Sequence, residues 1–152
     1  MTIRPATEDD AQSIADLVRS LSHFYQEDAS APLPEWFLST IQPESFTSRM
    51  NDPDDLHLVY ADSGAVKGYI AVKNATRIYH LFVDENLHGQ GIATRLWLAV
   101  RSRQPESRHY TVRSSLYAVP VYRKFGFFES GCLGFRDGIG FQPMTCDLHI
   151  DC

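Results

Sequence analysis

Apolar residues recur along this chain with two different spacings, and these predict a mixture of helices and strands. A helical spacing near the start predicts an amphipathic helix to about His23, carried by Ile14, Leu17, Val18 and Leu21. A short strand is expected before it over Thr2–Ala6, followed by a capping box at Thr7–Asp10 with Asp in place of the usual Glu. Residues 24–41 lack a clear period, which predicts a loop with a short helix, and residues 43–50 predict another helix.

The middle of the chain carries strand signals followed by a helix and a further strand. Two apolar-rich runs, Leu56–Ala61 and Ala65–Val72, flank three residues whose types favour a hairpin turn. A third strand of this meander is expected over Ile78–Val83. A helix from Ile92 to about Arg103 and a strand over His109–Arg113 then follow.

The last third predicts one short helix and two strands. The helix covers Tyr117–Phe125 and ends at Gly126, a typical C-terminal cap. The strand candidates are Phe127–Phe135 and Phe141–Ile150, joined through residues 136–140. Because the order shows no internal repeat or linker, residues 1–152 are expected to form a single domain of the α+β class.

Composition and charge narrow the class of function. At 152 residues the chain can bury a self-sufficient core, and 43% hydrophobic with 22% charged residues is ordinary for a globular protein. No apolar run approaches the roughly 18 residues of a membrane span, so no membrane partner is expected. The formal charge of −5 argues against nucleic acid as a partner and suits an amine substrate better, although the local field at a site matters more than the total.

The positions of cysteine and histidine give no sign of a metal site or of a disulfide framework. The three cysteines, Cys132, Cys146 and Cys152, are odd in number and lack C-x-x-C spacing. With no long apolar stretch at the start, they favour a reducing cytoplasm. The six histidines form neither H-x-x-x-H nor H-E-x-x-H, and no cysteine adjoins a recognisable base, so neither metal nor thiolate catalysis is expected.

The most informative segment is a glycine-bearing turn between an apolar strand and a helix. Gly89 and Gly91 remove side chains where a ligand would approach the backbone. The free N–H groups of the first helical turn lie at the positive end of the helix dipole, so they suit an anion such as a pyrophosphate. An ordinary loop before a helix remains the alternative. The dinucleotide fingerprint G-x-G-x-x-G is absent because Thr94 stands in place of the third glycine.

Two motifs in this order resemble the GNAT N-acetyltransferase superfamily. His88-Gly89-Gln90-Gly91-Ile92-Ala93 is similar to the acetyl-CoA signature Q/R-x-x-G-x-G/A, departing only at His88. Residues 115–127 resemble the later segment N-x-x-A-x-x-x-Y-x-x-x-G-F, with Ser115 in place of Asn. The resemblance covers nearly the whole chain. It implies a mixed, mostly antiparallel sheet of about six to seven strands flanked by helices, with splayed fourth and fifth strands.

The resemblance also implies acetyl-CoA as cosubstrate and direct acetyl transfer to a primary amine, without an acyl-enzyme. The residues expected to bind acetyl-CoA are Leu81, Phe82 and Val83 through their main chain, the turn residues His88, Gly89, Gln90, Gly91, Ile92, Ala93 and Thr94, and Ser115. The hydroxyl of Ser115 reaches less far than the family's Asn. His88 is a cation only when protonated, so binding through it would depend on pH.

Tyr122 falls where the family has a tyrosine that protonates the leaving thiolate of CoA, although an aromatic residue packed in the core is the alternative. For the general base, the resemblance implies that Arg77 and Tyr79 face the substrate, and strand alternation turns His80 to the other face, unless a bulge reverses that order. Tyr79 and His80 are both candidates, with a chain of waters as the default. Because family members bind their acceptors near the first helices, the resemblance implies an acceptor pocket that involves His23, Tyr25, Trp36 and Phe37, unless these only pack in the core.

Several readings of function stay open at this point. A noncatalytic acyl-CoA-binding sensor or scaffold would keep the turn without catalysis, and a transferase of a longer acyl group would share the same motifs. The acceptor could be a small amine, an antibiotic, a peptide N-terminus or a protein lysine. The resemblance also implies a possible homodimer built on edge strands.

Overall fold

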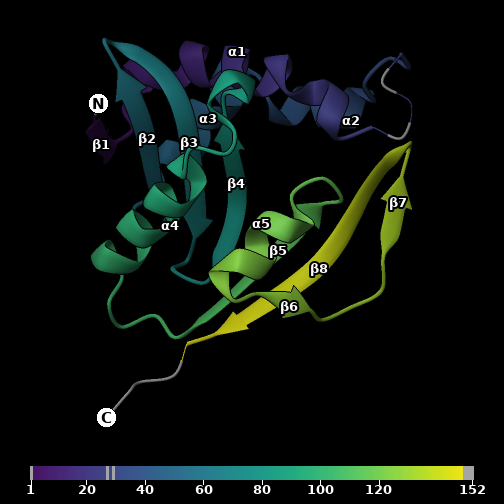
Figure 1. The fold of residues 1–152 in the computed structure, drawn as a ribbon. Coiled ribbons are helices and arrows are strands. Elements are labelled where there is room, and N and C mark those ends of the chain that lie inside the picture. Colours follow the sequence, from purple (N-terminus) through teal and green to yellow (C-terminus); the bar gives the residue numbers. More distant parts are fainter. Residues whose placement is uncertain (1, 27, 29, 149–152) are drawn as a thin grey trace.

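The computed structural model describes residues 2–26, 28 and 30–148 (Figure 1). The strands are β1 (Thr2–Pro5), β2 (Leu56–Asp62), β3 (Ala65–Lys73), β4 (Arg77–Val83), β5 (His109–Ser115), β6 (Phe128–Glu129), β7 (Gly134–Arg136) and β8 (Ile139–Asp147). The α-helices are α1 (Ala11–Ser20), α2 (Glu35–Thr40), α3 (Pro43–Met50), α4 (Ile92–Arg103) and α5 (Val119–Phe125). None of the described helices is long and apolar enough to cross a membrane.

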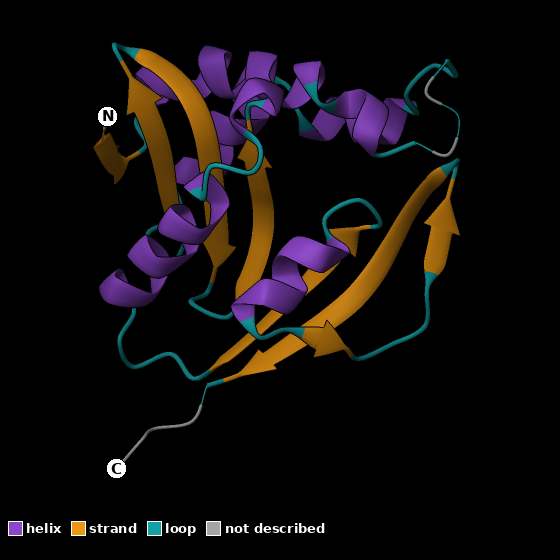
Figure 2. Ribbon diagram, viewed as in Figure 1, coloured by secondary structure: helices purple, strands orange, loops and turns teal. Residues whose placement is uncertain are grey.

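A single sheet organises these elements, in the order β1-β2-β3-β4-β5-β8-β6, with β7 also paired to β8. All neighbours are antiparallel except β4 and β5, which are parallel. Helices cover both faces of the sheet (Figure 2). The residues of β2 and β3 are therefore buried almost without interruption, as expected for strands that are covered on both sides.

Each face of the sheet has its own core. One core joins α1 and α3 to alternate residues of the sheet such as Val59 and Tyr69. The other joins α4 and α5 to the residues between them, such as Leu58 and Ile70. We call these the α1–α3 face and the α4–α5 face. The position of a residue along its strand thus decides to which of the two faces its side chain points.

The α+β class, the order of the elements and the mostly antiparallel sheet are confirmed. The capping box at Thr7–Asp10 is present: Asp10 accepts the Thr7 N–H at 2.8 Å and opens a short 3-10 turn before α1. The helix predicted from Tyr117 begins two residues later, at Val119. The sheet has eight strands rather than six to seven, because one predicted strand forms two.

That strand was predicted over Phe127–Phe135, which is wrong as one unit. Residues 130–133 leave the ladder between β6 and β7 and pass opposite only two residues of β8, one of which is Pro143. The Ser130 N–H still donates to the Pro143 carbonyl at 3.0 Å, but proline has no N–H to return, so the ladder ends at this pair. The predicted joint at 136–140 shrinks to a two-residue turn, Asp137-Gly138, with φ of +51° and +81°. The predicted end at Ile150 lies outside the described residues.

The predicted splay of the fourth and fifth strands is confirmed, because β4 and β5 pair at only two positions. Arg77 lies opposite Thr111, and Ile78 opposite Val112, after which the two strands diverge (Figure 1). β4 also carries a bulge where it pairs with β3, and Tyr79 is its extra residue. From Tyr79 onward, the edge of β4 that faces β5 is therefore open.

Candidate functional site

The glycine turn has the conformation that an anion site requires. Gly89 and Gly91 adopt φ of +82° and +79°, and a Cβ added at either would meet no atom within 4 Å. Gly91 is the N-terminal cap of α4, and Ile92 anchors the helix through its buried side chain. Within the described part of the chain, the N–H groups of Gly91, Ile92, Ala93 and Thr94 have no hydrogen-bond acceptor. Exposed, free donors at a helix N-terminus fit a pyrophosphate.

His88 and Gln90 lie in this turn with exposed side chains. The His88 ring turns back toward β4, where its Nε2 lies 2.8 Å from the Val83 carbonyl oxygen. Because a carbonyl only accepts, Nε2 carries the hydrogen and Nδ1 can accept from the Tyr117 hydroxyl, 3.3 Å away. The ring therefore links the end of β4 to the segment before α5, a role that the sequence did not predict.

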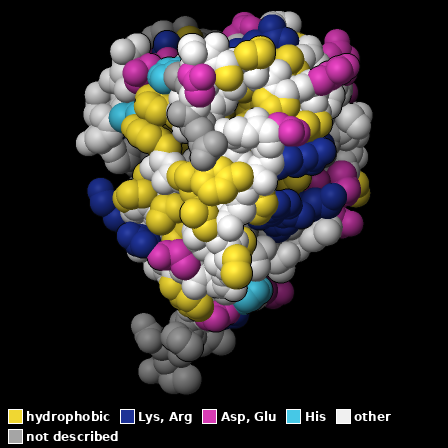
Figure 3. Space-filling model, turned by 90° about the vertical axis from the view of Figure 1, so that its right-hand side faces the viewer, with side chains coloured by type: hydrophobic (Ala, Val, Ile, Leu, Met, Phe, Trp, Pro, Cys, Tyr) yellow, Lys and Arg dark blue, Asp and Glu magenta, His cyan; other side chains and the backbone are white. Residues whose placement is uncertain are grey.

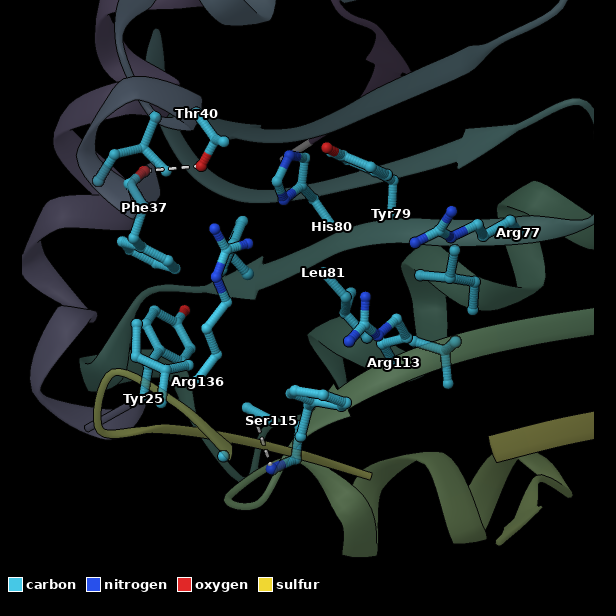
Figure 4. Close-up of a pocket in the computed structure, with 18 of the residues that line it drawn as sticks. Tyr25, Phe37, Thr40, Arg77, Tyr79, His80, Leu81, Arg113, Ser115 and Arg136 are labelled. Carbon is cyan, nitrogen blue, oxygen red and sulfur yellow. Dashed lines mark hydrogen bonds between the residues drawn. The ribbon is translucent and has the colours of Figure 1, made fainter. Parts of the chain in front are cut away.

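The divergence of β4 and β5 opens a cleft of about 280 Å³ (Figure 4). Its walls come from β4, β5 and α5, from α2 and the segment before it, and from β7 and β8. Among the predicted site residues, the cleft brings together Tyr25, Trp36, Phe37, Tyr79, His80, Leu81, Phe82, Ser115 and Tyr122. His23 does not line it, and lies instead 3.7 Å from a carboxylate oxygen of Glu85.

Tyr122 lies on α5, and its side chain is 4% exposed. Its ring packs edge-on against Phe125 and Phe127, with centroids 5.9 and 5.5 Å away. Its hydroxyl forms no hydrogen bond with any described residue, although the side chain lines the cleft. Burial raises the pKa of this phenol above its ordinary value, so the hydroxyl keeps its proton at neutral pH. A protonated, unpaired phenol can donate a hydrogen bond, and its raised pKa makes it a weaker acid than a free phenol.

Tyr25 also lines the cleft and interacts electrostatically with Tyr122. Its own pKa is raised, first by burial and second by the nearby Tyr122 phenol. Tyr25 comes from the segment before α2, on the α1–α3 face, whereas Tyr122 comes from α5 on the opposite face. The cleft therefore passes through the sheet from one face to the other.

Ser115 and the end of β4 supply polar main-chain and side-chain groups. The Ser115 hydroxyl accepts the Ala118 N–H at 3.2 Å, which leaves its own hydrogen for another acceptor. Leu81 and Val83 turn their side chains to the α4–α5 face and Phe82 turns its side chain to the α1–α3 face. Leu81 and Phe82 are half-buried and line the cleft, whereas Val83 is buried and does not line it.

The bulge in β4 changes which side chains point to the α1–α3 face. Tyr79 and His80 follow one another, yet both turn to the α1–α3 face, where Arg49 contacts the Tyr79 ring and Phe46 the His80 ring. Strict alternation would separate them, so the reversal considered from the sequence is present. Tyr79 is 38% exposed and lies between the guanidinium groups of Arg49 and Arg77, at 5.2 and 5.7 Å.

The His80 side chain is half-buried, and its Nε2 is fully buried with no hydrogen-bond partner among the described residues. Burial, and then the nearby Arg49 and His57, hold the pKa of His80 well below its ordinary value. The ring is therefore neutral at pH 7, and no hydrogen bond to a described residue engages either of its nitrogens. A neutral imidazole that lines a cleft can accept a proton, directly or through water.

Two arginines that line the cleft were missed in the sequence, Arg113 of β5 and Arg136 of β7. Arg113 lies two residues before Ser115 and so shares its side of the strand, which was the available signal. Arg136 carried no signal, because its place depends on how β7 folds back. Among the described residues no cluster of His, Cys, Asp and Glu could hold a metal ion.

Comparison with known proteins places this geometry in a family. The profile of a family described as "Acetyltransferase (GNAT) domain" matches residues 20–148. No curated protein matches the chain in sequence.

Solved structures share the fold at low identity. A GCN5-related N-acetyltransferase from Rhodopseudomonas palustris aligns with a TM-score of 0.76 at 21% identity, covering 97% of this chain and 95% of that one. The PaiA N-acetyltransferase of Thermoplasma acidophilum, in complex with coenzyme A, gives 0.76 at 15% identity, with 96% and 98% covered. The ribosomal-protein-alanine N-acetyltransferase of Brucella melitensis gives 0.72 at 18%, with 97% and 100% covered. Since the family profile covers most of its length, this chain belongs to the GNAT acetyltransferase family.

Proposed function

We propose that this chain binds acetyl-CoA and transfers the acetyl group directly to a primary amine. The observation that carries the proposal is the cleft through the splayed sheet, which extends from Tyr122 on one face to Trp36 on the other. Two reactants that enter from opposite faces can meet at the open edge of β4. The family supports acetyl transfer, and the coenzyme A bound to the PaiA enzyme of similar fold supports the cosubstrate.

The glycine turn fits the phosphates of acetyl-CoA, which brings an already activated acetyl group when bound. The free N–H groups from Gly91 to Thr94 would hold the pyrophosphate, and Gly89 and Gln90 would line its approach. The backbone of Leu81, Phe82 and Val83 and the hydroxyl of Ser115 would position the pantetheine arm. His88 would act mainly by fixing the Val83 carbonyl.

Proton transfer falls to two residues in this proposal. Tyr122 donates its phenolic proton to the departing sulfur, since its hydroxyl is protonated and unpaired. His80, which lines the cleft, accepts the amine proton on its neutral ring, directly or through water. Tyr79 shapes the wall beside His80, held by two guanidinium groups.

Direct transfer needs no enzyme nucleophile, and the described thiols do not offer one. Cys132 is exposed, and Cys146 is buried in the α4–α5 core with its pKa raised by burial. Neither lines the cleft. Both are free thiols, which supports a reducing cytoplasm as the location.

The test is release of free CoA thiol from acetyl-CoA across a panel of primary amines, with mass spectrometry of the products. An N-acetylated amine, and an unchanged protein mass after incubation with acetyl-CoA alone, would support direct transfer. Binding of CoA with no turnover on any amine would favour a noncatalytic sensor. Faster turnover with a longer acyl-CoA would show that a longer acyl group, and not acetyl, is the preferred group for transfer. Light scattering would test whether the chain forms a homodimer.

A further inference from the structure

The acceptor side of the cleft is basic, although the chain as a whole carries a formal charge of −5. Three arginines line it, Arg77, Arg113 and Arg136, and no aspartate or glutamate does. They come from different strands, and Figure 4 shows their side chains directed into the cleft. On the side of the molecule where α2 and β7 lie, Lys and Arg side chains gather beside hydrophobic ones (Figure 3).

These guanidinium groups lack carboxylate partners within the described part of the chain. The ion pairs there involve other residues. Asp137 follows Arg136 directly, but its Oδ2 accepts the Trp36 indole N–H at 2.7 Å. A guanidinium in a cleft without an anionic partner keeps its fork of donors for a ligand.

Aromatic rings hold each arginine in place. The guanidinium carbon of Arg113 lies 4.0 Å from the centre of the Phe141 ring, and that of Arg136 lies 4.1 Å from Trp36. Arg77 lies 5.7 Å from Tyr79. Stacking limits the freedom of these long side chains, so less entropy is lost when they bind an anion.

The arginines lie on the opposite face from the phosphate turn, so the phosphates of acetyl-CoA do not explain them. Ile78 and Val112 point to the α4–α5 core, so their neighbours Arg77 and Arg113 point to the α1–α3 face. The guanidinium group of Arg136 lies over the ring of Trp36 from α2, which is on that same face. The glycine turn instead begins α4.

We propose that the acceptor is a small amine that also carries an anionic group, a carboxylate or a phosphate, held by Arg77, Arg113 and Arg136. That the acceptor is an amine rests on the proposed acetyl transfer. That it carries an anionic group rests on the three arginines alone. Aromatic walls such as Trp36 and Phe141 suit an acceptor with an apolar body, and an α-amino acid combines these features. The volume of the cleft suits a molecule of that size.

A binding experiment separates this inference from acetyl transfer. With CoA present, calorimetry compares 3-phenylpropanoate with 3-phenylpropanamide, which differ in charge and not in shape. The carboxylate should bind at least about tenfold more tightly, as expected for charge-assisted pairing. The double variant R113Q/R136Q, and R77Q separately, should reduce this preference. R103Q, an exposed arginine at the end of α4, should keep it.

Turnover supplies the second arm. Phenylalanine is compared with phenylalaninamide, and phosphoethanolamine with ethanolamine, at equal concentrations of unprotonated amine. Faster turnover of phenylalanine than of its amide identifies the anionic group as a carboxylate. Faster turnover of phosphoethanolamine than of ethanolamine identifies it as a phosphate. Arginine-dependent binding of the carboxylate without any turnover would support the anion site and contradict acetyl transfer. Equal affinity for acid and amide, no binding of either, or a preference that survives in R113Q/R136Q would overturn the inference.

Discussion

Replacing Tyr122 with phenylalanine should separate catalysis from stability. The hydroxyl has no hydrogen-bond partner among the described residues, so its removal strands no other polar group. The ring and its contacts with Phe125 and Phe127 are kept. We therefore expect the free energy of unfolding to change by less than about 1 kcal/mol. A lost general acid should lower kcat by about 10²-fold or more, which corresponds to roughly 2.7 kcal/mol.

Tyr110→Phe is the matched control. Tyr110 is also buried, but its hydroxyl donates to Gln104 Oε1 at 3.1 Å and it does not line the cleft. Its loss should lower Tm by roughly 2–4 °C, as about 1 kcal/mol does in a domain of this size, and leave kcat unchanged. Thiol release gives kcat, calorimetry gives CoA affinity, and thermal unfolding gives Tm. Wild-type kcat in Tyr122→Phe, with an acceptor already confirmed, would make Tyr122 a core residue only.

Two further predictions concern the turn and His80. Gly91→Glu should abolish CoA binding in calorimetry by placing a negative charge where the pyrophosphate is expected, whereas Gly91→Ala should show only the backbone strain of φ +79°, about 1 kcal/mol. Unchanged affinity in a folded Gly91→Glu variant would argue against the phosphate turn. Because the pKa of His80 is lowered in the folded chain, below about pH 6.5 the unfolded chain binds a proton that the folded chain does not. The free energy of unfolding should therefore decrease as the pH is lowered. Urea unfolding at several pH values should show a smaller fall in His80→Gln, and an identical slope would contradict the neutral histidine.

The fold was predictable wherever local patterns agreed with the final packing. The glycine turn and α4 follow from residues adjacent in sequence, and both have the expected form. The strand Phe127–Phe135 was mispredicted because the interruption comes from Pro143, on another strand. The available local signal was Ser130-Gly131, because this dipeptide and a glycine within a strand pattern both favour an interruption. A pairing partner and a local signal can thus act together to end a strand.

For the site, too, local patterns fail where the pairing of strands decides the structure, and the bulge in β4 is an example. Alternation alone assigned Tyr79 and His80 to opposite faces, yet one extra residue turns both to the acceptor side. That bulge depends on the pairing of β4 with β3, which no pattern within β4 reveals. The turning of the His88 ring toward Val83 is likewise set by tertiary structure.

The charge of the chain shows why a total can mislead about a site. A net charge of −5 favours a cationic partner, but the acidic residues lie outside the cleft while three arginines line it. Ionic screening acts over roughly 8–10 Å in cells, so a ligand inside the cleft senses chiefly these nearby guanidinium groups. The folding of β7 against α2 brings Arg136 into this set and uses Asp137 to bind Trp36. The end of β7 thus adds a cation to the cleft while the turn after it engages the neighbouring carboxylate, so the charge inside the cleft is set by tertiary structure and not by composition.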